Sequence, residues 1–142
     1  MKIESYRKRL LTKTISQLKE IADDEISIYI RRKYSNWKGE APCYTCGIVK
    51  RWQEQQNGHY ISRTYNNTRY YEANLRVQCY SCNVMKHGNM DEYAYRLEKE
   101  KPGTLDHLNM WKHRKSTDST RLELIDIIFK YKKLIEVLDK NT

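Results

Sequence analysis

A chain of 142 residues is long enough for one domain, or for a small core with helical appendages, and can bury only a modest hydrophobic core. Its formal charge of +9 and its twelve tyrosines favour a nucleic-acid partner over a generic soluble surface, because cations neutralise phosphates and aromatic rings stack on exposed bases. The sequence has no apolar run near the roughly 18 residues of a membrane helix and no signal-peptide pattern, so we expect a cytoplasmic protein without a membrane partner.

Residues 1–38 are predicted to form a helical N-terminal segment. Thr14 and Gln17 have the spacing of a capping box, in which each side chain bonds the other residue's amide at the start of a helix. The basic residues 31–33 suit the negative end of the helix dipole, with contact to DNA phosphates as the alternative. Apolar residues spaced three or four apart indicate one buried face: Leu11, Ile15, Leu18, Ala22, Ile26 and Tyr29.

All four cysteines lie in the middle of the chain as two Cys-x-x-Cys pairs, Cys43 with Cys46 and Cys79 with Cys82. Two thiolate pairs at this spacing are typical of a structural zinc site, where each short turn supplies two ligands to one tetrahedral ion. Two disulfide bonds are the alternative, which the absence of a secretory signal disfavours. A thioredoxin-like redox pair is also disfavoured, because neither pair lies in a βαβ pattern.

Residues 39–101 are predicted to form the central unit, in the order strand, loop, strand, short helix. The first strand covers residues 48–56 with His59 at its end, and a polar, tyrosine-rich loop covers residues 62–71. Alternating apolar residues from position 75 predict the second strand, after which a short helix begins at Asn83 and stops at Gly88. So small a unit cannot bury enough surface alone, and we therefore expect zinc to supply folding free energy directly.

Residues 102–142 are predicted to form C-terminal helices with a possible role in dimerisation. A helix capped by Asn89 ends near residue 101, and Thr120 with Glu123 can cap a last helix that reaches about residue 140. Apolar residues of this last helix form a seam: Leu124, Ile128, Tyr131, Ile135 and Leu138. The seam predicts either packing against the N-terminal helix or a homodimer interface.

The residues between the cysteine pairs match a nuclease pattern. His59, Asn74 and Asn83 have the offsets of the HNH, or ββα-metal, nucleases, in which the third residue opens a helix. The motifs around them are P-C-Y-T-C-G, G-H-Y-I-S-R, T-R-Y-Y-E-A-N and Q-C-Y-S-C-N. These motifs resemble the NinG (Rap) recombination proteins of lambdoid phages, and the resemblance covers most of the chain from about residue 28.

This resemblance implies an α+β fold with a zinc-stabilised ββα-metal (HNH, His-Me finger) core flanked by N- and C-terminal helices. It also implies a metal-dependent DNA endonuclease of phage recombination that cuts branched DNA, such as Holliday junctions, in the host cell cytoplasm. Two alternatives stay open. One is a zinc-dependent DNA-binding protein without catalysis, and the other is a general HNH nuclease of restriction or packaging.

The resemblance assigns roles to individual residues. His59 is the candidate general base, since its imidazole is neutral near pH 7. Asn74 is expected to hold the loop and to orient the His59 ring, and Asn83 offers a carboxamide oxygen to Mg²⁺ or Mn²⁺. His87, four residues after Asn83, is a further candidate ligand for that cation, with a phosphate contact or plain surface as alternatives.

The predicted DNA-binding residues are Arg63, Arg69 and Lys86. Arginine matches phosphate through its planar fork of donors, and the alternative for the two arginines is a salt bridge within the loop. Gly58 occupies the position where many HNH nucleases carry an acidic residue or a second histidine as a metal ligand. This departure leaves the cation's ligand set incomplete and keeps the non-catalytic alternative open.

Overall fold

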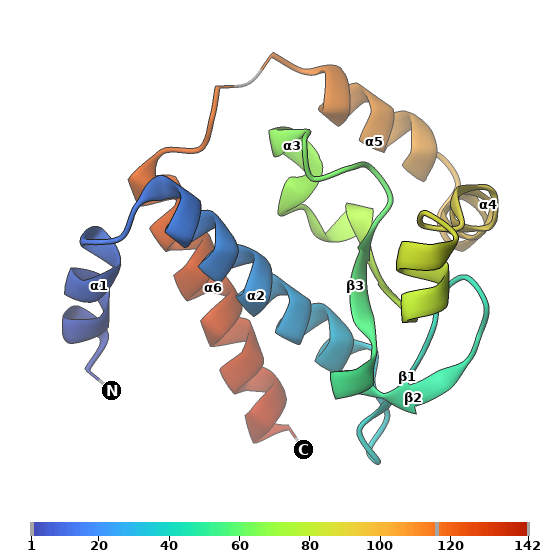
Figure 1. Ribbon diagram of the computed structural model, residues 1–142, viewed down its shortest axis with the longest axis horizontal. Helices are drawn as coiled ribbons and strands as arrows, with labels where there is room; N and C mark the ends of the chain where they lie inside the picture. The colour runs from blue at the N-terminus through green and yellow to red at the C-terminus, as the bar shows by residue number, and fades with distance from the viewer. Residues whose placement is uncertain (1, 116, 142) are drawn as a thin grey trace.

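The computed structural model describes residues 2–115 and 117–141. Residues 1, 116 and 142 fall within the predicted first and third segments and lie outside the described residues. The described part has an α+β fold in which two small antiparallel sheets lie among helices (Figure 1).

The N-terminal segment forms two helices, α1 (Ile3–Leu11) and α2 (Ile15–Lys33). The predicted capping box at the start of α2 is confirmed, because the Gln17 amide donates to the Thr14 hydroxyl at 3.1 Å and the Thr14 amide donates to the Gln17 side chain at 2.9 Å. The apolar stripe is confirmed along α2. The prediction that Leu11 belongs to this stripe is wrong, because the chain turns between the helices, so that Leu10 is buried and Leu11 is 45% exposed.

The last helix, α6 (Arg121–Lys140), lies beside α2 and runs in the same direction (Figure 1). Its start contacts the start of α2 through a hydrogen bond from Arg121 to the Lys13 carbonyl, and its end pairs Asp139 with Arg32. The Thr120 capping box is confirmed. The buried part of the seam packs against α1 and α2, as the intramolecular alternative predicts. Homodimerisation stays a prediction.

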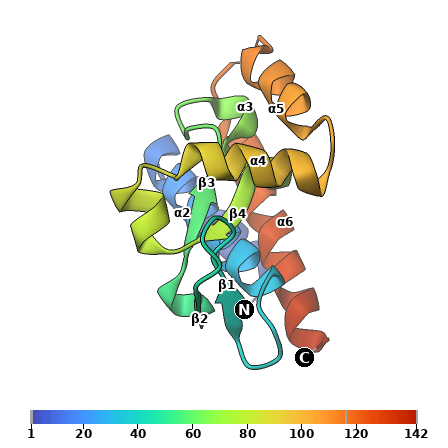
Figure 2. The ribbon, with the colours of Figure 1, turned by 90° about the vertical axis from the view of Figure 1, so that its right-hand side faces the viewer.

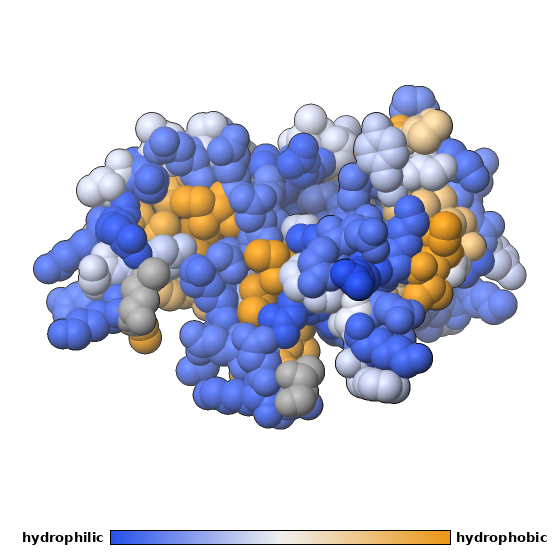
Figure 3. Space-filling view, turned by 60° about the horizontal axis from the view of Figure 1, so that its bottom comes forward, coloured by the Kyte–Doolittle hydropathy of each residue, from blue (hydrophilic) through white to orange (hydrophobic). Residues whose placement is uncertain are grey.

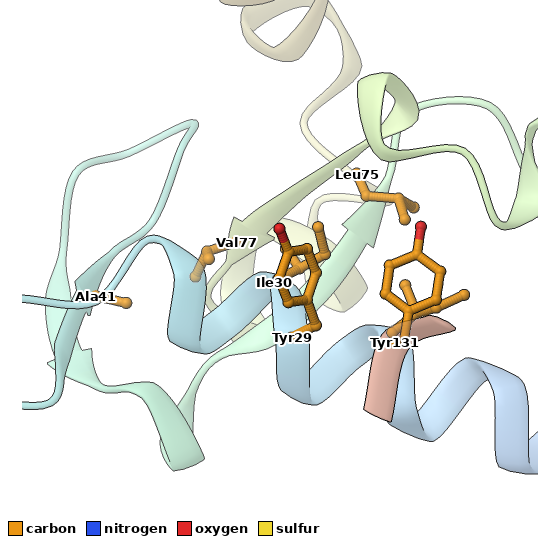
Figure 4. Close-up of a cluster of buried hydrophobic side chains, with 7 residues drawn as sticks. Tyr29, Ile30, Ala41, Leu75, Val77 and Tyr131 are labelled. Atoms are coloured by element: carbon orange, nitrogen blue, oxygen red, sulfur yellow. The ribbon is translucent and has the colours of Figure 1, made fainter. Parts of the chain in front are cut away.

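One buried cluster joins this helix pair to both sheets. Figure 4 shows its side chains converging from α2, α6 and the strands, and its labelled members are Tyr29, Ile30, Ala41, Leu75, Val77 and Tyr131. At about 25 cal/mol per Å² of apolar surface, each fully buried side chain of the size of Val, Leu or Ile contributes roughly 1.5–3 kcal/mol. The cluster therefore fixes the strands against α2. The position of the pocket between α2 and β3, described below, depends on this packing.

Each sheet is an antiparallel pair. Strand β1 (Glu40–Pro42) pairs with β2 (Val49–Arg51), and β3 (Gln56–His59) pairs with β4 (Leu75–Gln78). The single strand predicted over residues 48–56 is wrong, because a 3-10 turn, η1 (Trp52–Glu54), divides it. Arg31 fixes this turn, since its guanidinium lies 5.1 Å from the Trp52 ring centre and donates to the Trp52 carbonyl at 3.3 Å.

The remaining elements are short and surround β3 and β4: α3 (Asn66–Arg69), η2 (Glu72–Asn74), η3 (Ser81–Met85), α4 (Met90–Glu100) and α5 (Thr104–His113). Figure 2 shows α4 in front of β3 and β4, where the Tyr93 hydroxyl donates to the Gly58 carbonyl at 2.7 Å. The predicted side-chain cap at Asn89 is wrong, because Asn89 has a φ of +48° and makes no such bond. The sequence did not predict α5 as a separate helix.

The face shown in Figure 3 is mainly hydrophilic, with apolar residues in separate patches. Within residues 2–115 and 117–141, none of the helices has the length and apolar character needed to cross a bilayer.

Candidate nuclease and metal site

The four cysteines come together as the sequence predicts. Cys43 and Cys46 lie in the turn between β1 and β2, and Cys79 and Cys82 follow β4. All four Sγ atoms lie within 4.8 Å of one another, with Cys46 and Cys79 at 3.7 Å. A tetrahedral zinc ion with Zn–S bonds of about 2.3 Å places its sulfurs about 3.8 Å apart. The cluster can therefore hold a metal such as zinc, and its cysteines are free thiols rather than disulfides.

Polar groups already surround these sulfurs. The Cys82 amide donates to the Cys79 sulfur at 3.4 Å, the Asn89 amide group donates to the Cys82 sulfur at 3.8 Å, and the Thr45 hydroxyl lies 3.5 Å from the Cys43 sulfur. Donors of this kind stabilise thiolates and orient them toward a metal. The role of Asn89 thus differs from the helix cap predicted for it.

An open pocket of about 530 Å³ lies between α2 and β3, separate from the cysteines. It brings the predicted catalytic residues His59 and Asn83 and the predicted DNA-binding residue Arg63 together with carboxylates from α2. Its described lining consists of Asp23, Asp24, Ser27, Arg31, Gln55, Gln56, Asn57, His59, Arg63 and Asn83.

His59 is the last residue of β3, paired across the sheet with Leu75. Its Nε2 lies 3.1 Å from the backbone carbonyl of Arg69. Because a carbonyl oxygen only accepts hydrogen bonds, Nε2 carries the proton, and Nδ1 is the atom of the neutral ring that can accept one. Burial lowers the pKa of His59 to about 4, against the opposing effects of the Arg69 carbonyl and the Asp23 charge. The ring is therefore neutral at pH 7.

Asn74 is buried, and its side chain binds backbone groups of the loop between β3 and β4. Its Oδ1 accepts from the Ile61 amide at 2.7 Å, and its Nδ2 donates to the carbonyls of Ile61 at 3.0 Å and Thr68 at 3.1 Å. Thr68 directly precedes Arg69, whose carbonyl bonds His59. Among the described contacts no direct bond joins the two side chains, so the role of Asn74 in orienting the His59 ring stays a prediction that the loop backbone would have to mediate.

Asn83 lies inside η3 rather than at the start of a helix, since this single turn begins at Ser81. Its Nδ2 donates to the Gln56 side-chain oxygen at 2.7 Å. This hydrogen bond occupies the side-chain nitrogen of Asn83. The carboxamide oxygen is then the atom that Asn83 can offer to a cation in the pocket.

The two arginines of the loop pair with Asp23 on α2. Arg69 binds it through both ends of its fork, at 3.1 and 2.6 Å, and Arg63 contacts the same carboxylate at 3.3 Å. The salt-bridge alternative therefore holds for both residues, with a partner on α2 instead of the loop. The Arg69 side chain is 18% exposed and that of Arg63 is 61% exposed, so Arg63 is the one that can also reach a phosphate.

His87 and Lys86 do not join this site. Both side chains are exposed, and neither lines the pocket as far as the chain is described. The spacing argument for His87 is wrong because η3 ends at Met85 and His87 adopts a φ of +51°. His87 therefore does not continue the helical face that carries Asn83.

Gly58 has a packing reason for lacking a side chain. A Cβ atom added there would lie 2.1 Å from the Oε1 of Gln78, which is fully buried. Gln78 cannot move easily, because its Nε2 donates to the Thr45 hydroxyl at 3.1 Å and to the Gly88 carbonyl at 2.8 Å. Any side chain at position 58, including a metal ligand, would disrupt these bonds.

Replacing Gly58 by Ala is expected to lower the free energy of unfolding by about 1–3 kcal/mol, as overpacking a filled site does. The measurement is chemical denaturation of the wild type and the variant. A Gln78→Ala background provides the control, since it removes the obstructing atoms. The cost of Gly58→Ala should shrink there, and an equal cost in both backgrounds would show that Gln78 is not the obstacle.

The imidazole of His59 is expected to titrate below pH 5, as followed by the NMR shifts of its ring. Its folded-state pKa of about 4 lies below the roughly 6.5 of an unfolded histidine. The unfolded chain therefore binds the proton more readily, and the contribution of neutral His59 to stability is present above pH 6.5 and lost as pH falls toward 4. An observed midpoint near 6.5 would refute the burial of this ring.

The acidic residues of the pocket are those that the sequence analysis missed. Asp23 and Asp24 lie about 35 residues before His59, and no motif marks them. The sequence does contain one pattern that could have indicated Asp23. Polar residues recur every four positions at Asp23, Ser27 and Arg31, and so form a polar helix face away from the apolar stripe.

Searches of curated proteins and of solved structures found no match to this chain. The family model described as Bacteriophage Lambda NinG protein matches residues 2–141. That match spans both cysteine pairs, the pocket and the flanking helices. The chain therefore belongs to the NinG family.

Proposed function

We propose that this protein is a metal-dependent DNA endonuclease of phage recombination, built on an HNH core. One observation carries the proposal: His59 and Asn83, from the two halves of the motif, line the same pocket, beside a loop that Asn74 pins. The order β3, loop, β4, η3 agrees with a ββα-metal unit. Membership of the NinG family supports the recombination context.

His59 is the proposed general base. Hydrolysis of a phosphodiester is assisted by a group that takes a proton from the attacking water, and an imidazole can accept that proton only in its neutral form. The His59 ring is neutral at pH 7, with Nε2–H held by the Arg69 carbonyl and Nδ1 able to accept the proton. The pocket beside it is open enough to admit a phosphate group.

The pocket also has donors that suit a hard divalent cation such as Mg²⁺ or Mn²⁺, which prefers oxygen ligands. Asp23 is engaged by two arginines, so Asp24 and Asn83 are the residues that we expect to hold the cation. When bound, the cation would stabilise the negative charge that develops on the phosphate. The zinc proposed for the four cysteines is structural, because its ligand set is complete without water or substrate.

DNA is the proposed partner. The formal charge of +9 supports binding to phosphates, and Arg63 at the pocket rim is the arginine placed to contact one. A branched substrate such as a Holliday junction follows from the recombination context of the family. The host cytoplasm is the proposed location.

The test is cleavage of four substrates side by side, namely a four-way junction, nicked duplex, single-stranded DNA and linear duplex. Each is assayed with zinc-loaded protein, with and without Mg²⁺ or Mn²⁺. We expect cation-dependent cutting with preference for the junction. Binding without any cutting would favour a zinc-dependent DNA-binding protein, and equal cutting of linear duplex would favour a general HNH nuclease.

A further inference from the structure

Asp23 connects α2 to the catalytic candidate through the backbone. Its side chain is 14% exposed and uses both carboxylate oxygens on Arg69, with Arg63 sharing one of them. A bidentate ion pair of this kind holds the guanidinium in one orientation in addition to binding it. The carbonyl of the same Arg69 is the hydrogen-bond partner of the His59 ring.

The carbonyl of Arg69 needs such support. It belongs to α3, a four-residue turn too short to be stable by itself. Asn74 secures the turn at the preceding carbonyl, that of Thr68. Asp23 secures it at Arg69, from an element that the core already holds through Leu18, Ala22 and Ile26. The first half of the turn is held by Asn67, which donates to the carbonyls of Trp111 at 2.8 Å and Arg114 at 2.7 Å, whereas Asp23 holds the Arg69 end.

We propose that Asp23 is a positioning residue for His59: by anchoring Arg69, it fixes the carbonyl that sets the tautomer and orientation of the imidazole. The proposal deepens the nuclease function and rests on it for its catalytic consequence. Without the anchor, α3 keeps its bonds through Asn74 and Asn67 but loses the contact that holds Arg69, and the His59 ring samples both neutral tautomers. The tautomer with its proton on Nδ1 cannot accept a proton there from water.

The variant that tests this is Asp23→Asn, which keeps the shape and removes the charge. Its matched control is Glu25→Gln on the same helix, because Glu25 is 16% exposed and pairs with Lys132 of α6 at 2.9 Å, away from the pocket. The tautomer of His59 is read by long-range ¹H–¹⁵N correlation spectra of zinc-loaded protein without DNA. We expect a single Nε2–H tautomer in the wild type and in Glu25→Gln, and a mixture in Asp23→Asn.

Cleavage kinetics give the second readout. In Asp23→Asn, kcat is expected to fall roughly ten- to a hundredfold, in line with the effect of a misplaced catalytic group. KM for DNA should stay unchanged or fall, because the released arginines can bind phosphates. A purely structural role would instead give Asp23→Asn and Glu25→Gln the same profile. Arg69→Gln removes the other partner of the ion pair, and the same loss of the single tautomer is expected there, so the test survives poor folding of Asp23→Asn.

The proposal is overturned if His59 keeps its single Nε2–H tautomer in Asp23→Asn and Arg69→Gln. It is also overturned if the tautomers mix while kcat matches that of Glu25→Gln. Absence of cleavage by the wild type would instead reject the nuclease function, and the tautomer comparison would still decide whether Asp23 positions His59.

Discussion

Replacing Cys43 by Ser is expected to abolish binding of the proposed zinc and to unfold the central unit. Cys43 is buried within the four-sulfur cluster, and serine is a poor zinc ligand. Structural zinc in small domains contributes about 10–16 kcal/mol of apparent binding free energy, which is also folding free energy. The strands that the cluster joins are only three or four residues long, so few other contacts can replace it.

The measurement pairs metal content per chain with the melting temperature. Ser81→Ala is the matched control, because Ser81 is exposed and lies between the proposed ligands Cys79 and Cys82. Ser81→Ala should keep one zinc per chain and the wild-type melting temperature, and chelation of the wild type should reproduce the Cys43→Ser result. If Cys43→Ser retains zinc and melts like the wild type, the four-cysteine site is wrong.

Features encoded within a few residues could be read from the sequence. The capping boxes at Thr14 and Thr120 depend on side chains three positions apart, and both are present. The cysteine pairs are equally local, because a Cys-x-x-Cys turn presents two sulfurs together wherever it folds. The pairing of the two turns was predictable as well, since one tetrahedral ion needs both of them.

Features that depend on tertiary contacts could not be read in this way. The strand predicted over residues 48–56 is divided because Arg31, from another element, binds the carbonyl of Trp52. His87 has a suitable offset from Asn83, but the offset matters only if the helix continues, and η3 ends at Met85. Asp23 meets Arg69 across 46 positions, a pairing that no local pattern contains.

The cysteine cluster and the pocket occupy different parts of the fold. The cysteine cluster lies beyond the carboxyl end of β4 and the pocket lies between α2 and β3, so the loss of a side chain in the pocket need not disturb the cluster. This separation permits a loss-of-activity variant that remains folded. His59 offers the clearest case, because the one described hydrogen bond of its ring is to a backbone carbonyl. The ring belongs to neither the cysteine cluster nor the core cluster, so its removal should leave both intact.

His59→Ala is therefore expected to give a folded, zinc-loaded protein that binds junction DNA and cuts it about two to four orders of magnitude more slowly, the usual effect of losing a general base. The measurements are single-turnover cleavage, DNA binding and zinc content. His87→Ala is the matched control, because His87 is exposed and outside the pocket lining, and it should cut at the wild-type rate. Asn83→Ala should also lose cleavage, with partial recovery in Mn²⁺ if Asn83 binds the cation.

The three variants together separate the possible outcomes. Slow cutting by His59→Ala with normal cutting by His87→Ala is the result expected for a base in the pocket. Slow cutting by His87→Ala would restore that residue as a ligand and would mean that the turn after η3 rearranges when the cation or DNA binds. Equal rates for the wild type and His59→Ala would reject the HNH assignment, because no other described side chain of the pocket combines a neutral imidazole with an anchored tautomer.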